Sequence, residues 1–208
     1  MENKTLRTWM QELASKDGKY TGGSAASSVA AISVSLAQFI FELQAGKKRY
    51  EEQEELIQAG IKRAASLQND LLELIEIDAS AFEPVLPLYR LPQKTADDKA
   101  IREEKLNAGL AGASQPPYEM MQKIAETVDL YEQLEGLNLA GSLKVDVVIG
   151  LDIAIAALKS SKNSSMINII GITDDELKKE LTEKVERFYE ETLEKAKEIK
   201  KRTESSID

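Results

Sequence analysis

Apolar residues recur every three or four positions along most of this 208-residue chain, which is the spacing of amphipathic α-helices rather than of β-strands. No stretch shows sustained β-alternation, and no internal repeat is visible. We therefore expect a single all-helical domain that spans residues 1–208. The pattern predicts helices over residues 5–16, 24–45, 49–76 with a continuation to 82, 95–114, 116–134, 142–170 and 174–202.

Two of the predicted helices, residues 24–45 and 142–170, carry few charges and are rich in small and aliphatic residues. A helix that is apolar on nearly all sides is usually buried. The expected fold is therefore an all-α bundle of long antiparallel helices, with these two small-residue-rich helices paired at its centre. Serines, together with Gln38 and Glu42, interrupt the apolar run of residues 25–43, so we expect no membrane span.

Prolines and capping residues predict where the helices begin and end. Pro84 and Pro87 lack an N–H donor and are expected to kink or end the third helix after residue 82. Thr95–Asp98 resembles a capping box, with aspartate in place of the usual Glu or Gln. Pro116–Pro117 suits the first turn of a new helix, so we expect a break there. Thr173–Glu176 is expected to cap the last helix.

The chain carries 36 acidic and 27 basic side chains, and its formal net charge is −9. A nucleic-acid binder needs a concentrated basic surface, so we expect no nucleic-acid partner, and an anionic substrate needs a local basic patch. The first residues lack the apolar core of a secretory signal, and the chain has no cysteine, so we expect a cytoplasmic protein.

The absence of both histidine and cysteine narrows the possible chemistry. It excludes imidazole acid–base catalysis, thiol nucleophiles and ordinary zinc sites, and we expect no metal. Any catalysis must therefore use carboxylates, lysines, hydroxyls, amides or backbone dipoles.

The two ends of the helix at residues 24–45 carry the first candidates for ligand contact. Gly22, Gly23 and Ser24 form its start, where unpaired N–H groups and the positive end of the helix dipole can hold an anion or a polar atom. Lys47 and Lys48 follow its other end and offer cations. From residue type alone, a loop with a serine cap and a solvated basic helix end are the simpler interpretations.

Four further polar residues have both a structural and a functional interpretation. Asp78 lies among apolar neighbours and Asp146 lies inside a helix of low charge, and a buried carboxylate must be paired or hydrogen-bonded in either role. Arg102 is the cation expected to pair with one of these carboxylates or with a ligand. Asn168 suits either a helix C-cap or an amide that contacts a ligand.

Several short segments occur in a specific order along nearly the whole chain, although each is weak by itself. They are Gly22–Ser24, Gly46–Tyr50, Leu74–Phe82, Leu91–Pro92, Ala100–Arg102, Ala113–Pro117, Asp146, Ile167–Asn168 and Thr173–Asp174. In this order they resemble the formiminotransferase-cyclodeaminase C-terminal domain family, which includes stand-alone methenyltetrahydrofolate cyclohydrolases.

The resemblance implies an all-helical homodimer whose substrate is a tetrahydrofolate one-carbon adduct. The enzyme would either release ammonia from the formimino form or hydrolyse the methenyl form, and a chain without a transferase domain slightly favours hydrolysis. Both reactions pass through a tetrahedral carbon between two folate nitrogens, so the site must hold the folate, move protons and stabilise charge. The implied catalytic residues are Asp146, Asp78 and Lys47, and the implied substrate-binding residues are Gly22, Gly23, Ser24, Lys48, Arg102 and Asn168.

Four positions depart from the family pattern, and all of them lie in polar motifs. Tyr20 and Thr21 stand where the family usually has Pro-Gly. Val145 replaces a serine, and Ser164 replaces an asparagine. These departures motivate an alternative, in which the chain is a catalytically diverged family member that acts as a folate-binding or helical interaction module.

Overall fold

The computed structural model describes residues 4–207, and within that range every regular element is a helix. This confirms the all-α fold class. The elements are α1 (Leu6–Leu13), α2 (Gly22–Gln44), the 3₁₀ helix η1 (Lys48–Gln53), α3 (Glu54–Ala81), the 3₁₀ helix η2 (Leu86–Arg90), α4 (Ala96–Glu135), α5 (Gly141–Ile170) and α6 (Asp175–Ser205).

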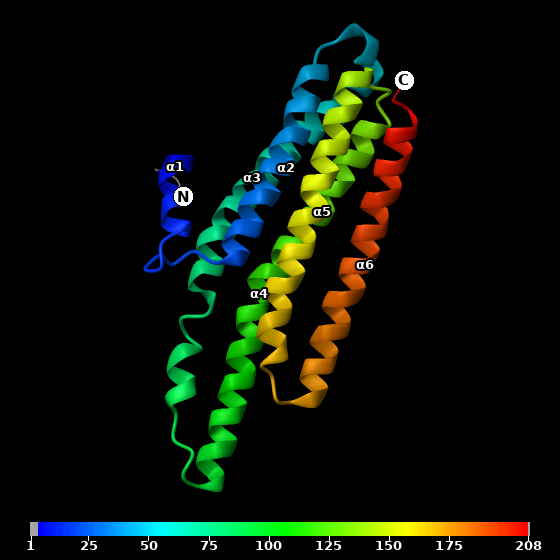
Figure 1. Cartoon of the computed structure of the whole chain (residues 1–208). Helices are drawn as coiled ribbons and strands as arrows, with labels where there is room; N and C mark the ends of the chain where they lie inside the picture. The colour runs from blue at the N-terminus through cyan, green and yellow to red at the C-terminus, as the bar shows by residue number, and fades with distance from the viewer. Residues whose placement is uncertain (1–3, 208) are drawn as a thin grey trace.

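The five long helices from α2 to α6 alternate in direction along the bundle (Figure 1). α2 packs against α3 and α5, and α5 also packs against α4 and α6, so the predicted pairing of the two small-residue-rich helices is confirmed. The short α1 lies to one side, next to α2 and α3 in the view of Figure 1. Because directions alternate, the start of α2 and the end of α5 lie at the same end of the bundle.

Polar contacts around Tyr131 tie the three central helices together. Its hydroxyl, on α4, donates to the backbone carbonyl of Ser33 on α2 at 2.6 Å. The Ser33 hydroxyl donates in turn to the carbonyl of Gly150 on α5 at 2.8 Å. A Cβ added at Gly150 would lie 1.8 Å from the Tyr131 hydroxyl, so only glycine permits this approach. Burial raises the pKa of Tyr131 above its ordinary value.

α4 runs through Pro116 and Pro117 without a break, so the predicted boundary at these prolines is wrong. Each proline lacks the N–H that would bind the carbonyl four residues earlier, which for Pro117 is that of Ala113. Asn168 on α5 donates its Nδ2 to this carbonyl oxygen at 3.0 Å. A tertiary hydrogen bond therefore replaces the missing helical one, and the helix continues.

The predicted caps are confirmed. Thr95 Oγ1 accepts from the N–H of Asp98, and Asp98 Oδ2 accepts from the N–H of Thr95, both at 3.0 Å. Asp174 caps α6 through its side chain. The third helix begins later than predicted, because Lys48–Gln53 forms a 3₁₀ helix after Gly46, whose φ is +70°. Only glycine adopts such an angle readily, so this residue ends α2.

α2 and α5 contribute much of the core, but each also leaves an apolar side uncovered within one chain. We call this surface the α2–α5 face. Its large exposed apolar residues are Val29, Ile32, Phe39 and Leu43 of α2 with Val145 and Ile149 of α5. A monomeric protein rarely leaves a contiguous apolar surface of this kind open to water.

The hydropathy of α2 is higher than its serines led us to expect. Among residues 4–207 it is the one helix with the length and composition of a membrane span, with a mean hydropathy of 1.6 over its best window. Of that window, 56% is buried inside the molecule, and core helices pass the same test.

Candidate functional site

A groove of about 620 Å³ opens where the start of α2 meets the end of α3, the middle of α4 and the second half of α5. We call it the Asp78 groove. Hydroxyl, amide and carboxylate groups line it together with a few apolar side chains, and none of its lining residues is Lys or Arg. Its polar side chains are Thr21, Asp78, Ser160, Asn163, Ser164 and Asn168, and its large apolar ones are Phe82 and Ile167.

Asp78 reaches from α3 to the first turn of α2. Its Oδ2 accepts hydrogen bonds from the hydroxyls of Thr21 at 2.9 Å and Ser24 at 3.1 Å. A Cβ added at Gly23 would lie 2.2 Å from Oδ1, so the carboxylate packs directly against the glycine backbone. Only 8% of Asp78 is exposed, and the positive end of the helix dipole favours its negative charge. The predicted anion cradle is thus occupied by a carboxylate of the same chain.

Ser24 belongs to this arrangement without lining the groove. It is completely buried, and its hydroxyl is shared between Asp78 and the carbonyl of Ile75 at 3.2 Å. Gly22 and Gly23 do line the groove. Of the three residues predicted at the helix start, Gly22 and Gly23 therefore form part of the groove wall, and Ser24 positions Asp78 through its hydroxyl.

Tyr20 and Thr21, two of the four departures from the family pattern, have different roles. Tyr20 points away from the groove, where its ring packs on Trp9 with 5.8 Å between centroids and its hydroxyl donates to Glu76 Oε1 at 2.7 Å. Lys19 pairs with Glu76 Oε2 at 2.6 Å, and the hydrogen bond from Lys19 lowers the pKa of Glu76 to about 2. Tyr20 thus anchors α1 on α3, while Thr21 holds Asp78.

Asn168 and Ser164 lie one turn apart on α5, and both face the groove. The Nδ2 of Asn168 is engaged by the carbonyls of Ala113 at 3.0 Å and Ser164 at 3.3 Å. Its Oδ1 has no partner within residues 4–207, so that oxygen is available to a ligand. The Asn168 side chain is therefore not the C-cap that was its structural interpretation.

Lys47, Lys48 and Asp146 lie at the opposite end of the bundle. α2 alone separates the start of the groove from Lys47 by ~35 Å, at about 1.5 Å per residue. Asp146 and Ser164 share one side of α5 but are 18 residues apart, which corresponds to ~27 Å. Lys47 is exposed and binds Gln44 at 3.3 Å, and Asp146 is half-buried. None of these three residues lines the Asp78 groove.

Arg102 lines a second cavity, of about 280 Å³, which lies next to the Asp78 groove. Its Nε atom is buried and has no hydrogen-bond partner in the described part of the chain. Within the same residues, no three Asp, Glu, His or Cys side chains converge as metal ligands.

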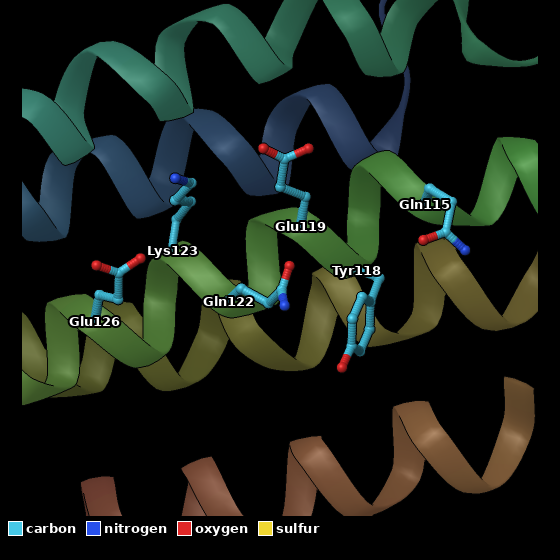
Figure 2. Close-up of a pocket in the computed structure, with 6 residues that line it drawn as sticks. All are labelled: Gln115, Tyr118, Glu119, Gln122, Lys123 and Glu126. Atoms are coloured by element: carbon cyan, nitrogen blue, oxygen red, sulfur yellow. The ribbon is translucent and has the colours of Figure 1, made fainter.

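A third cavity, of about 290 Å³, lies on the outer side of α4 and carries no comparable chemistry. Figure 2 shows that all six of its labelled side chains come from α4, from Gln115 to Glu126. Two of its three charged groups are paired with α3, because Lys123 binds Asp70 at 2.8 Å and Glu126 binds Arg63. Exposed pairs of this kind contribute little to stability.

Sequence reasoning did not single out Ser160 and Asn163, which line the groove, or the bond from Thr21 to Asp78. The available signal was the polar run at residues 160–165, in a helix that is otherwise mainly apolar. The contact of Thr21 with Asp78 had no local signal, since 57 residues separate the two.

Several known proteins are similar in sequence to most of this chain. A methenyltetrahydrofolate cyclohydrolase from Methylorubrum extorquens is 29% identical over 191 residues, which cover 91% of this chain and 90% of that protein. Formimidoyltransferase-cyclodeaminases from Sus scrofa and Rattus norvegicus are 26% and 27% identical. The chain spans about a third of the length of these two, 35% and 34%.

A solved structure has the same fold. The formiminotetrahydrofolate cyclodeaminase of Thermotoga maritima superposes with a TM-score of 0.79 over 96% of this chain and 97% of its own, at 22% identity. None of these relatives supports the alternative of a non-catalytic interaction module. The model of the formiminotransferase-cyclodeaminase family matches residues 5–187 in one continuous stretch. The chain therefore belongs to the formiminotransferase-cyclodeaminase family.

Proposed function

We propose that this protein is a methenyltetrahydrofolate cyclohydrolase that binds a tetrahydrofolate one-carbon adduct in the Asp78 groove. The observation that carries the proposal is the nearly buried Asp78 carboxylate, which is held by two hydroxyls in a groove without Lys or Arg. The alignment with the Methylorubrum cyclohydrolase over nine-tenths of both chains supports the same reaction.

The groove suits attack of water on a cationic carbon. The methenyl carbon lies between two folate nitrogens and shares their positive charge, which the Asp78 carboxylate stabilises. As general base, the carboxylate takes a proton from the attacking water, which adds to this carbon. The protonated Asp78 then returns this proton to one of the two nitrogens, whose bond to the carbon breaks, while the hydroxyl group loses its proton to water and becomes the formyl oxygen. Thr21 and Ser24 fix the carboxylate during these steps, and the free Oδ1 of Asn168 orients the ring.

A second candidate is formiminotetrahydrofolate cyclodeaminase, because the related Sus scrofa protein is named for that activity. In this reaction a folate nitrogen attacks the formimino carbon, and ammonia leaves after it receives a proton. The same carboxylate, once protonated, can supply that proton. Ammonia release from the formimino substrate separates this activity from hydrolysis of the methenyl form.

We also propose that a second copy of the chain covers the α2–α5 face. A two-fold axis across this face pairs two antiparallel copies of α2. The basic Lys47–Lys48 end of one subunit then lies opposite the Asp78 groove of the other, so charges of opposite sign meet. Such a homodimer also brings Asp146 of the partner subunit toward the groove, which a single chain does not.

The direct test of the function is loss of the near-ultraviolet absorbance of methenyltetrahydrofolate on addition of pure protein. We expect acceleration over buffer, and we expect Asp78→Asn to lower kcat by about 100-fold or more while its melting temperature stays close to that of the native protein. No acceleration, together with no rise in melting temperature on adding folate, would exclude the proposal. Folate binding without turnover would instead support the diverged binding module.

A further inference from the structure

The Asp78 groove has no cationic side chain that could pair with the negatively charged tail of a folate. Folates carry a glutamate tail, whose carboxylates need cationic or hydrogen-bonding partners when they leave water. None of the groove's lining residues is cationic, and Asp78 would repel a carboxylate placed beside it. Within one chain, the groove itself therefore offers the tail no cationic partner.

A second cavity begins one helical turn from the groove. Leu110 and Gly171 line this cavity, whereas Ala113 and Asn168 line the groove. The two pairs are three residues apart on α4 and on α5, which corresponds to about 5 Å. Leu110 and Gly171 pack closely, since a Cβ added at Gly171 would lie 3.1 Å from Leu110 Cδ1. The two hollows thus follow one another along the contact between α4 and α5.

The second cavity contains two cations that form no ion pair within residues 4–207. They are Arg102 and Lys99, which both line it. The buried Nε of Arg102 also lacks a hydrogen-bond partner there. An arginine that lines a cavity and forms no ion pair can pair with an anionic ligand.

The acidic and amide groups of this cavity are already engaged by the loop before α6. Glu103 accepts the hydroxyl of Thr173 at 2.8 Å, and Asn107 accepts the Thr173 N–H at 2.8 Å. These bonds order one wall of the cavity. Glu103 forms no ion pair with Arg102 within residues 4–207, although both line the cavity.

We propose that the Arg102 cavity binds the glutamate carboxylates of the folate substrate, with Arg102 as the main contact and Lys99 as the second. The planar guanidinium can donate two parallel hydrogen bonds to one carboxylate, which a lysine cannot do. This assignment rests on the proposed function. It does not use Lys47 and Lys48, the cations that the sequence first offered for ligand contact, because they lie at the far end of the same chain.

The test compares two substrates, methenyltetrahydrofolate and the methenyl derivative of tetrahydropteroate, which lacks the glutamate. For Arg102→Met we expect kcat/KM to fall about 10-fold for the glutamate-bearing substrate, mainly through KM, with no change for the pteroate substrate. Arg102→Lys restores part of the loss. Lys105→Met, an exposed cation on the same helix, is the control and changes neither substrate.

Two results overturn the assignment. One is an equal loss for both substrates in Arg102→Met and Arg102→Lys, because a structural role does not depend on the tail. The other is a substrate preference that disappears in Lys47→Met and persists in Arg102→Met. If the native protein converts neither substrate, the proposed function is refuted. The binding site of the tail is then tested by the shifts in melting temperature on adding folate and on adding pteroate. A larger shift with folate that is lost in Arg102→Met supports it, and equal shifts refute it.

Discussion

The side-chain amide of Asn168 donates to the carbonyl oxygen of Ala113, which Pro117 leaves without its helical partner. The bond joins α5 to the one place where α4 lacks its own hydrogen bonding. Asn168 is also one of the residues that line the Asp78 groove. The same side chain thus supports the continuity of α4 and forms part of the groove wall.

Asn168→Ala should lower the free energy of unfolding by about 1–2 kcal/mol, because it leaves the Ala113 carbonyl buried and unpaired. In a Pro117→Ala background the loss should be smaller, since the restored N–H can bind that carbonyl. Chemical denaturation of the four proteins measures the coupling. Asn163→Ala, an exposed neighbour in the same groove, should change little. Strictly additive effects of the two mutations would contradict this account.

Gly22 and Gly23 form a matched pair for testing the placement of Asp78. A Cβ at Gly23 would collide with the Asp78 carboxylate, whereas one at Gly22 meets nothing within 4 Å. We expect Gly23→Ala to lower kcat by about 100-fold through displacement of the carboxylate, and Gly22→Ala to remain active. Steady-state kinetics with thermal melts measure both effects. Equal activity of the two variants would show that the position of Asp78 does not matter.

The contact of Lys19 with Glu76 makes the N-terminal anchor sensitive to acid. The pKa of Glu76 is lowered from 4.5 to about 2 in the folded protein, mainly by Lys19. The stabilisation is therefore complete above pH ~5 and is lost as the pH falls through ~2, because the folded state must then accept a proton. Glu76→Gln should melt below the native protein at pH 7, and the gap should close by pH ~2.

The control for the acid experiment is Glu73→Gln, an exposed residue on the same helix, whose melting gap should stay small at every pH. Circular dichroism across the pH range records the melts. A Glu76→Gln gap that does not change between neutral and acid pH would contradict the assignment.

Ile32 lies on the α2–α5 face and is 55% exposed in the single chain. If a second copy covers this face, Ile32→Glu buries an unpaired charge and should convert dimers to monomers at micromolar concentration. Light scattering measures the mass. Leu56→Glu, at an exposed apolar position of α3, should leave the dimer intact. A native protein that is monomeric at the same concentration would refute the homodimer.

Much of the fold follows from local sequence. Helical spacing located every long helix, and Thr95 with Asp98 forms the expected capping box. The break at Pro116–Pro117 was wrong because its remedy, the Asn168 amide, is on another helix. No local rule identifies a donor supplied from 51 residues further along the chain, counted from Pro117.

The candidate site was only partly predictable. Gly23, Asp78 and Asn168 meet in one groove because the start of α2, the end of α3 and the end of α5 share one end of the bundle. The same alternation of helix direction sends Lys47 and Asp146 to the other end. The positions of these five residues along their helices could have shown which end of the bundle each one occupies. The family resemblance grouped the five as one site and did not use these positions.

Buried serines on α2 determine how far this helix can slide along its neighbours. Ser27 donates to the carbonyl of Leu71 on α3 at 2.6 Å, and Ser33 donates to that of Gly150 on α5 at 2.8 Å. A slip by one turn moves α2 by about 5.4 Å and breaks both bonds. The two serines thus fix the position of α2 along its axis and keep Gly23 beside Asp78. Ser33 does so although it lies ~15 Å along α2 from Gly23. Ser27 and Ser33, which do not line the groove, therefore maintain the alignment of the helices that form it.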